Sequence, residues 1–442
     1  MTINTYGVKE IITESLPGLT DARRAYLIGR GSGQMDSVAS VAAEILADVA
    51  ERGDIALIEL ASSLDAVRLE SVEVPRKRWL GAVDAISPDL RAAMERAIRN
   101  IEVVQRSLLP CATTASPEPG IVVTRQPLAL DRVGVYAPGG RAAYPSSVLM
   151  GVVPARVAGV GEIVVCSPPG PDGLPSQAVL AAAELAGVHR VFAIGGAGAI
   201  GAMAYGTESV PHVDRIVGPG NAYVAAAKLQ VARTVGIDSP AGPSELLVIA
   251  DSTANPDVIA REMLAQAEHD PEAVAIVIAI GQEIAQNILA RVKTLLPTQS
   301  RRGIIESSLT TRGAFLWTQE ISTAIDFSNE FAPEHLLLAV DDASALLPRL
   351  RTAATIFVGE SSSVAFGDYM TGANHVLPTG GLARSYSGLS VLDFIRWTTY
   401  QQIDPVAAAS LAGDVGVFAD AEGLFAHAAA ARQWATVGAG LP

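Results

Sequence analysis

Short apolar runs alternate with alanine-rich segments between about residues 132 and 250. Runs of this length, set between glycine- and proline-rich turns, are typical of buried strands, and the alanine-rich segments have the length of helices. The predicted strands are 133–136, 162–166, 190–194, 214–217 and 246–250, and the predicted helices lie near 146–158, 177–186, 199–205 and 222–234. A strand–helix–strand alternation with right-handed crossovers builds a parallel, doubly wound sheet.

The same alternation continues beyond residue 250. A helix is predicted from Pro256, and further strands are predicted at 273–280, 314–317, 336–340 and 355–358. We expect this second α/β unit to share its sheet with the N-terminal segment. After Gly388 the pattern favours helices only, and a tail without strands should pack on something else, such as another subunit.

The N-terminal part, to about residue 115, favours helices. Ser87, Pro88 and Asp89 form a helix start, with a capping hydroxyl, a proline at the first helical position and an acid near the positive helix end. We therefore predict an α/β fold of two doubly wound, incomplete Rossmann-like parallel-sheet domains with helical N- and C-terminal extensions. The predicted division is 1–30 for the N-terminal helical extension, 31–131 plus 245–388 for the first α/β domain, 132–244 for the second, and 389–442 for the C-terminal helical tail.

Composition narrows the class of protein. Hydrophobic residues make up 49% of the 442 residues and aromatics only 5%, which suits parallel strands covered by small-residue helices. A net charge of −14 argues against nucleic-acid binding, since phosphates need a dense Lys/Arg surface. The uncharged stretch 191–207 contains five glycines and predicts a strand, loop and helix, so we expect no membrane span.

We expect a cytoplasmic protein. Residues 1–20 lack a basic start followed by an apolar segment, so no signal peptide is predicted. Two cysteines, Cys111 and Cys166, cannot form a disulfide framework, which favours a reducing compartment.

Four of the six histidines have chemically suggestive neighbours. Gln266 and His269 share the last turn of a predicted helix, where they could hold one metal ion or form a polar helix end. Asp368 and His375 lie in a glycine-rich loop of the kind that displays sites. His427 lies on a predicted helix, and nothing in the spacing alone brings it to the others.

Glu334 and His335 stand directly before an apolar run that predicts a strand. A carboxylate beside an imidazole at a loop-to-strand junction is a natural base and proton shuttle. A buried ion pair is an equally good interpretation of the two residues.

Two glycine-rich loops follow predicted strands. Gly-Pro-Gly-Asn at 218–221 leads into a helix, whose free N–H groups could receive an anion such as a pyrophosphate. Residues 196–201 form a G-x-G-x-x-G, which resembles a dinucleotide fingerprint. That fingerprint normally opens the first strand–helix turn of its domain, and this copy follows a third strand, which favours a chance match. Cys166 has no histidine near it in sequence, which disfavours a nucleophilic role.

In a series of motifs the chain resembles the histidinol dehydrogenase family, in the family's order from about residue 130 to 430. The motifs are Arg-Val-Gly-Val-Tyr-Ala-Pro-Gly-Gly (132–140), Gly-Pro-Gly-Asn-Ala-Tyr-Val (218–224), Ala-Gly-Pro-Ser-Glu (241–245), Gln-Ala-Glu-His (266–269), Ala-Pro-Glu-His (332–335), Gly-Asp-Tyr (367–369), Asn-His-Val-Leu-Pro-Thr-Gly-Gly (374–381), Ser-Gly-Leu-Ser (387–390) and Glu-Gly-Leu (422–424) with His427.

The resemblance implies two successive NAD-dependent oxidations, from L-histidinol through L-histidinal to L-histidine. It implies one zinc ion per subunit, held by Gln266, His269, Asp368 and His427 in a mixed N/O set unlike the thiolate sites of structural zinc. It makes His335 the base of the alcohol oxidation and Glu334 the residue that activates water. The substrate-binding residues it implies are Ser244, Gln266, His269, His335, Asp368, His375, Glu422 and His427.

The resemblance also implies a homodimer whose sites borrow Glu422 and His427 from the partner chain. The first domain would carry the metal and catalytic residues, and the second would form the NAD side. NAD would contact Tyr136, Asn221 and the position of Gly198, where the family has a glutamine. The loss of that glutamine predicts weaker NAD binding, unless the glycines of 196–201 form a working close-approach loop.

Two other functions fit the same residues. One is a paralogous zinc- and NAD-dependent dehydrogenase that acts on another small polar alcohol. The other is a zinc hydrolase, because a metal, a glutamate and a histidine also describe metal-assisted attack by water. The loop at 218–221 favours an enzyme that uses a nucleotide.

Overall fold

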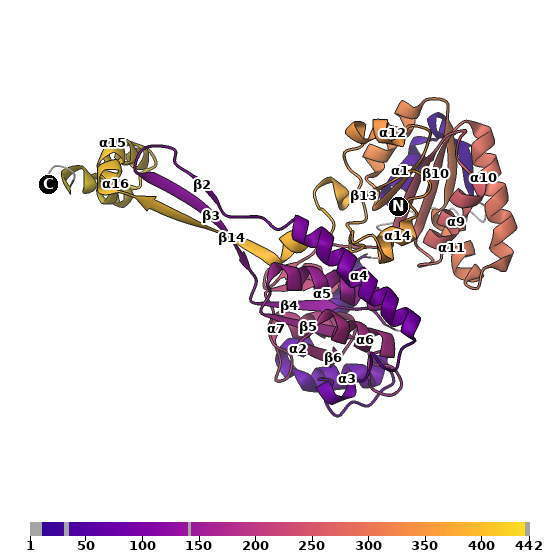
Figure 1. The fold of residues 1–442 in the computed structure, drawn as a ribbon, viewed down its shortest axis with the longest axis horizontal. Helices are drawn as coiled ribbons and strands as arrows, with labels where there is room; N and C mark the ends of the chain where they lie inside the picture. The colour runs from indigo at the N-terminus through magenta and orange to yellow at the C-terminus, as the bar shows by residue number, and fades with distance from the viewer. Residues whose placement is uncertain (1–10, 31–34, 140–142, 438–442) are drawn as a thin grey trace. The chain divides into compact units, whose positions relative to one another are not determined.

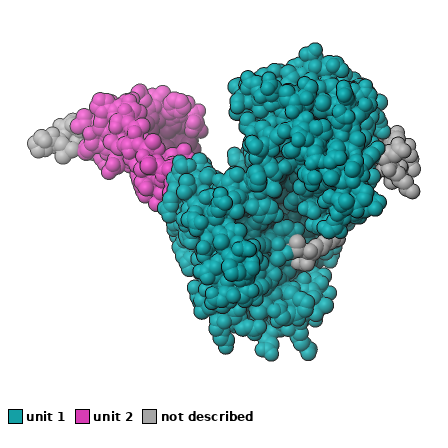
Figure 2. Space-filling model, turned by 45° about the vertical axis from the view of Figure 1, so that its right-hand side comes forward, with its two compact units in different colours: residues 1–108, 131–394 teal, residues 109–130, 395–442 magenta. Residues whose placement is uncertain are grey.

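The computed structural model describes residues 11–30, 35–139 and 143–437. The chain divides into two compact units (Figure 2). Unit 1 comprises residues up to 108 together with 131–394, and unit 2 comprises 109–130 together with 395–442. The described part of the chain contains no helix long and apolar enough to cross a membrane.

Unit 1 contains a five-stranded parallel sheet in the order β6-β5-β4-β7-β8 (Figure 1). Its elements are β4 (Arg132–Tyr136), α5 (Pro145–Ala158), β5 (Glu162–Ser167), α6 (Gln177–Ala186), β6 (Arg190–Ala193), α7 (Gly196–Tyr205), β7 (Arg215–Val217), α8 (Ala222–Val231) and β8 (Gly236–Ile237). The first strand, β4, lies in the middle, so the direction of winding reverses between β4 and β7. Ligands of doubly wound sheets bind at such a switch point, outside the carboxyl ends of the strands.

N-terminal helices cover this sheet. Side chains of α2 (Met35–Arg52) and α3 (Asp54–Leu64) share one apolar cluster with α7 and α8. Helix α4 (Pro88–Ser107) packs against α5 and α6. The sequence assigned 31–131 to the same domain as 245–388, whereas α2 and α3 pack on the sheet of 132–237. Helical periodicity shows that a face is buried and does not identify its partner.

A second parallel sheet of unit 1 has six strands in the order β1-β11-β10-β9-β12-β13. Its strands are β1 (Ile12–Ser15), β9 (Glu245–Ala250), β10 (Val274–Ile280), β11 (Ala314–Thr318), β12 (His335–Ala339) and β13 (Thr355–Val358). Its helices are α1 (Asp21–Gly29), α9 (Pro256–Ala267), α10 (Gln282–Leu295), α11 (Arg302–Arg312), α12 (Ile321–Phe331), α13 (Ala343–Leu346) and α14 (Val364–Tyr369). The winding again reverses at the first central strand, between β9 and β12.

The α/β class with parallel, Rossmann-like sheets is confirmed. The N-terminal extension is not helical alone, because β1 joins the six-stranded sheet beside β11, as the expected sharing of the sheet required. Strand β9 is buried along its whole length, which explains why its continuous apolar run predicted a strand.

Unit 2 is an antiparallel sheet with a small helical end. It contains β2 (Thr113–Ala115), β3 (Ile121–Ala129), β14 (Ile395–Ile403), α15 (Pro405–Ala421), α16 (Phe425–Arg432) and α17 (Trp434–Val437). The expectation of helices only after Gly388 was wrong, because β14 pairs with β3 along its full length. Isoleucine, tryptophan, tyrosine and threonine in β14 have high strand propensity, and the partner strand lies far away in sequence.

Candidate active site

Glu334 and His335 meet the start of β9 at one end of the six-stranded sheet. Ala332 ends α12 in the left-handed region (φ 51°), and His335 opens β12 three residues later. In the parallel pairing His335 stands opposite Leu246 of β9. Both side chains are buried, with Glu334 5% and His335 3% exposed. The pair therefore lies at the amino ends of the strands next to the switch point, not at the carboxyl ends where such sites are usual.

The Glu334 carboxylate has two donors at the start of β9. Its Oε2 accepts a hydrogen bond from Ser244 Oγ at 2.6 Å and another from the Glu245 N–H at 2.7 Å. Burial raises the pKa of Glu334 to about 8, although both hydrogen bonds favour the charged form. A carboxyl group with a pKa near neutrality can accept and release a proton during a reaction.

The His335 ring is oriented by the same segment. Nδ1 lies 2.9 Å from the Glu245 carbonyl oxygen, which can only accept, so Nδ1–H is the donor and Nε2 is left as the acceptor. Burial lowers the pKa of His335, which favours this neutral form. Nε2 lies 3.7 Å from Asp368 Oδ1 and makes no hydrogen bond within the described residues. His335 is therefore prepared to take a proton at Nε2.

Arg30 and Glu245 support this arrangement, and sequence reasoning gave them no role. Arg30 Nε lies 2.8 Å from Glu245 Oε1, which also accepts from the Gly380 N–H at 2.7 Å. The Arg30 guanidinium covers the Phe331 ring, with its Cζ 3.7 Å from the ring centroid. Glu245 was part of the family motif at 241–245, so a signal for it existed. Arg30 contacts residues more than 200 positions away, and no local pattern marks it.

Asp368 and His375 extend the site from α14 and the loop after it. Burial raises the pKa of Asp368 to about 6, while the nearby His335 opposes that shift. His375 Nδ1 is 2.9 Å from the Asp368 carbonyl oxygen, and its Nε2 is 3.5 Å from Ser147 Oγ on α5. Burial lowers the pKa of His375 to about 4, so the ring is neutral near pH 7. Helix α14 and the loop after it thus bring a carboxyl group and a neutral imidazole beside the Glu334–His335 pair.

Gln266 and His269 stand at the end of α9. The helix ends at Ala267, so Gln266 lies in its last turn and His269 follows the C-cap residue Glu268. Gln266 is 3% exposed, and its Nε2 has no hydrogen-bond partner within the described residues. His269 lines a cavity of about 330 Å³ together with Tyr369, the neighbour of Asp368. The cavity continues over apolar side chains of α4 and the start of α5.

These donors suit a mixed N/O metal site. Within the described residues no three His, Cys, Asp or Glu side chains gather as metal ligands. The predicted set has only two members of those types in unit 1, His269 and Asp368, since the third is an amide. The amide oxygen of the buried Gln266, the imidazole of His269 and the carboxylate of Asp368 are N/O donors of the kind that fits zinc, provided that a fourth ligand is supplied. The predicted fourth ligand, His427, lies on α16 of unit 2 and is exposed there, as is Glu422 after α15.

The predicted NAD residues lie at the end of β4 and in the segments after β6 and β7. The Tyr136 hydroxyl accepts the Gly196 N–H at 3.1 Å, and burial raises the pKa of that phenol to about 12. Asn221 caps α8, its Oδ1 accepting from the N–H groups of Tyr223 and Val224. Gly198 is buried within α7, where a Cβ would lie 3.1 Å from Leu60 Cδ1 of α3. The G-x-G-x-x-G thus follows the outer strand β6, away from the switch point.

Comparisons with known proteins agree on one family. The family model described as histidinol dehydrogenase matches residues 29–434. The histidinol dehydrogenase of Methanosarcina barkeri is 44% identical, over 96% of this chain and 97% of that protein, and the one of Chromobacterium violaceum is 44% identical over 95% and 97%. A crystal structure of histidinol dehydrogenase from Elizabethkingia anophelis superposes with a TM-score of 0.92 at 34% identity, covering 97% of this chain and 98% of that one.

Proposed function

The chain belongs to the histidinol dehydrogenase family, and on that premise we propose that it oxidises L-histidinol to L-histidine through L-histidinal, the last steps of histidine biosynthesis, with NAD and zinc. The observation that carries the proposal is the buried Glu334–His335 pair, oriented by Ser244 and Glu245. NAD, when bound, accepts the hydride in both oxidations.

His335 serves the first oxidation. As a hydride leaves the alcohol carbon, the hydroxyl group must lose its proton, and a base within hydrogen-bond reach makes this easier. His335 Nε2 can receive that proton because Nδ1–H is committed to the Glu245 carbonyl oxygen. The products are the aldehyde and a protonated His335, which passes its proton to water.

Glu334 serves the second oxidation. Water adds to the aldehyde carbon, and one of its protons goes to Glu334, whose raised pKa suits a base that must also release the proton. The hydrate anion then loses a hydride from carbon to NAD and its remaining hydroxyl proton to water, which leaves the carboxylate. Ser244 and the Glu245 N–H keep the Glu334 carboxylate in one orientation through both changes of charge.

Gln266, His269 and Asp368 would hold the zinc ion together with His427. The ion, when bound, supplies coordination that positions the imidazole and amine nitrogens of the substrate and keeps the reactive aldehyde in the site between the two oxidations. His375 and Glu422 would complete the contacts to the substrate. The chemistry of this mixed N/O donor set supports the assignment.

We propose that His427 and Glu422 come from the partner chain of a homodimer. Unit 2 exposes large apolar side chains, including Val406 at 75%, Phe418 at 74% and Phe425 at 71%. An apolar surface of this kind favours a contact with another protein surface.

Two free cysteines and no disulfide between them support a cytoplasmic location.

For NAD, the proposed contacts are Tyr136 and Asn221, whereas a Cβ at Gly198, the third position that the sequence predicted, would point at Leu60 of α3. The switch point between β4 and β7 supports the two contacts, because the loops that follow these strands flank it.

An assay of NADH absorbance with L-histidinol tests the proposal. Removal of metal by a strong chelator should abolish NADH formation while circular dichroism keeps the folded signal, because the proposed ligands are dispersed over separate elements. Added zinc should restore the rate. NADH formation in verified metal-free protein would contradict the metal assignment, and turnover of an ester or peptide in place of histidinol would favour a hydrolase.

A further inference from the structure

A buried ion pair lies beneath the loop that links β7 to α8. Lys228 of α8 is 3% exposed and Asp238, just after β8, is 4% exposed, and their charged groups are in contact. A buried ion pair adds little stability compared with apolar side chains of the same size, because both charges lose their hydration. Its presence at this position therefore calls for an explanation other than stability.

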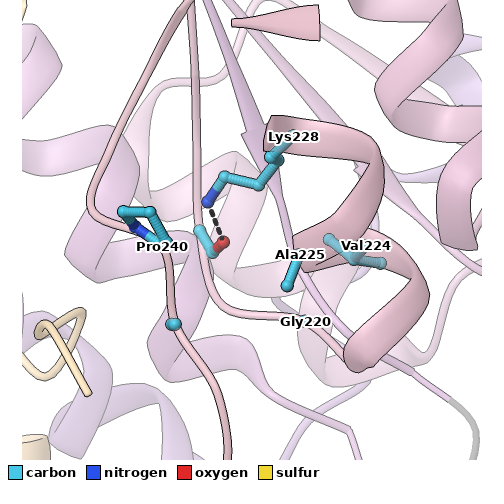
Figure 3. Close-up of a pocket in the computed structure, with 7 residues that line it drawn as sticks. Gly220, Val224, Ala225, Lys228 and Pro240 are labelled. Atoms are coloured by element: carbon cyan, nitrogen blue, oxygen red, sulfur yellow. Dashed lines mark hydrogen bonds between the residues drawn. The ribbon is translucent and has the colours of Figure 1, made fainter. Parts of the chain in front are cut away.

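Both members of the pair bind the same loop residue. Asp238 Oδ2 accepts the Gly218 N–H at 2.7 Å, and Lys228 Nζ donates to the Gly218 carbonyl oxygen at 3.1 Å. Figure 3 shows Lys228 extending from α8 to this carbonyl group. The two hydrogen bonds fix both peptide groups that flank the Gly218 Cα.

Gly218 is held in a conformation that needs this support. Its φ is +119°, and a Cβ at this position would lie 2.1 Å from the Tyr136 carbonyl oxygen at the end of β4. The loop therefore passes directly over the switch point between β4 and β7. Toward α8, the loop packs closely on Val224, since a Cβ at Gly220 would lie 2.4 Å from Val224 Cγ1.

The loop then presents its remaining amides to a ligand. Asn221 satisfies the N–H groups of Tyr223 and Val224, and within the described residues the N–H groups of Gly220 and Asn221 donate no hydrogen bond. Free amides at the start of a helix are favourable for a phosphate group. The space between this loop and Pro240 measures only about 10 Å³, room for about one water molecule, so a nucleotide would lie on the loop and not behind it.

We propose that Lys228 and Asp238 are positioning residues for the dinucleotide: their ion pair holds Gly218, and through it the 218–221 loop, in the shape that receives the pyrophosphate. This inference rests on the proposed NAD dependence. Neither side chain touches the cofactor, and both act through the Gly218 backbone.

Calorimetric titration of zinc-loaded protein with NAD tests the assignment. The double variant Lys228→Met/Asp238→Leu replaces the pair by apolar side chains, so it leaves no unpaired buried charge and should fold. We expect the Kd for NAD to rise about tenfold or more. A change of this size corresponds to the loss of roughly one charge-assisted hydrogen bond. The Kd for L-histidinol, titrated without NAD, should stay unchanged. Asp238→Asn, which keeps an acceptor for the Gly218 N–H, should give a smaller rise in the NAD Kd.

Glu73→Gln is the matched control. Glu73 makes a two-bond ion pair with Arg190 at the amino end of β6, in the same sheet but away from the loop. Glu73→Gln should lower the free energy of unfolding without changing the Kd for NAD. If the folded double variant binds NAD like the unmodified protein, the positioning role alone is overturned. If the double variant does not fold, the same result with folded Asp238→Asn overturns it. An unmodified protein that does not bind NAD would overturn the proposed function as well.

Discussion

Glu245 is the residue on which the catalytic pair depends, since its N–H holds Glu334 and its carbonyl oxygen holds His335. One backbone residue thus orients both proposed bases, and Arg30 and Gly380 fix its side chain. Any movement at the start of β9 would displace both bases together. Their separate roles must therefore be tested by changes that leave this backbone in place.

Glu334→Gln is such a change. The amide oxygen can still accept from Ser244 and the Glu245 N–H, but the side chain can no longer take a proton. Oxidation of histidinal should slow by about a hundredfold to ten-thousandfold, the usual contribution of a general base, while oxidation of histidinol slows much less. Single-turnover NADH formation from each substrate measures the two steps. An equal loss from both starting substrates would refute the division of roles.

Cys166 provides a second test at the residue scale. It is buried in the core, and burial raises the pKa of its thiol, so little thiolate forms at neutral pH. Native protein treated with iodoacetamide at pH 8 should be labelled at the exposed Cys111 only, with both cysteines labelled after unfolding. Mass spectrometry of the peptides gives the result. Rapid labelling of Cys166 in native protein would revive a thiol nucleophile for aldehyde oxidation.

At the scale of elements, Gly198 of α7 tests how the proposed NAD side is packed. A Cβ here points at Leu60 of α3, so Gly198→Gln must push that side chain aside. We expect the free energy of unfolding to fall by about 1–3 kcal/mol, as in other overpacked cores, without tighter NAD binding. Leu60→Ala in the same chain should recover part of the loss. Denaturant unfolding and NAD calorimetry measure both effects, and a lower NAD Kd in Gly198→Gln would instead support a lost glutamine contact.

The parallel strands could be predicted because burial on both faces leaves continuous apolar runs, as in 246–250 and 274–280. The strands of unit 2 were missed because their burial is slight and their partners are distant: Ile395 pairs with Ala129. Glu334 and His335 were recognised from a local pair, and their family roles came from the motifs. The position of the pair at the amino ends of β9 and β12, and its support from Arg30, depend on tertiary contacts that no local pattern contains.

At the scale of the whole molecule, the proposed exchange of His427 between subunits can be tested by complementation. Glu334→Gln and His427→Ala each inactivate a different contribution to the site. In a mixed dimer with exchanged His427, one site carries both defects and the other carries neither. Each variant alone should fail to oxidise L-histidinal, and co-refolding the two should therefore restore part of the NADH formation from L-histidinal. If mixed dimers are isolated and remain inactive, each site is built within one chain.

The yield of NADH per histidinol shows whether one enzyme carries out both oxidations. With limiting L-histidinol, excess NAD and zinc-loaded protein, the reaction should run to two NADH for each histidinol consumed, with L-histidine as the product. A final yield of one NADH, with histidinal released, would contradict the role of Glu334 and the retention of the aldehyde between steps. No NADH from histidinol would contradict the proposed substrate.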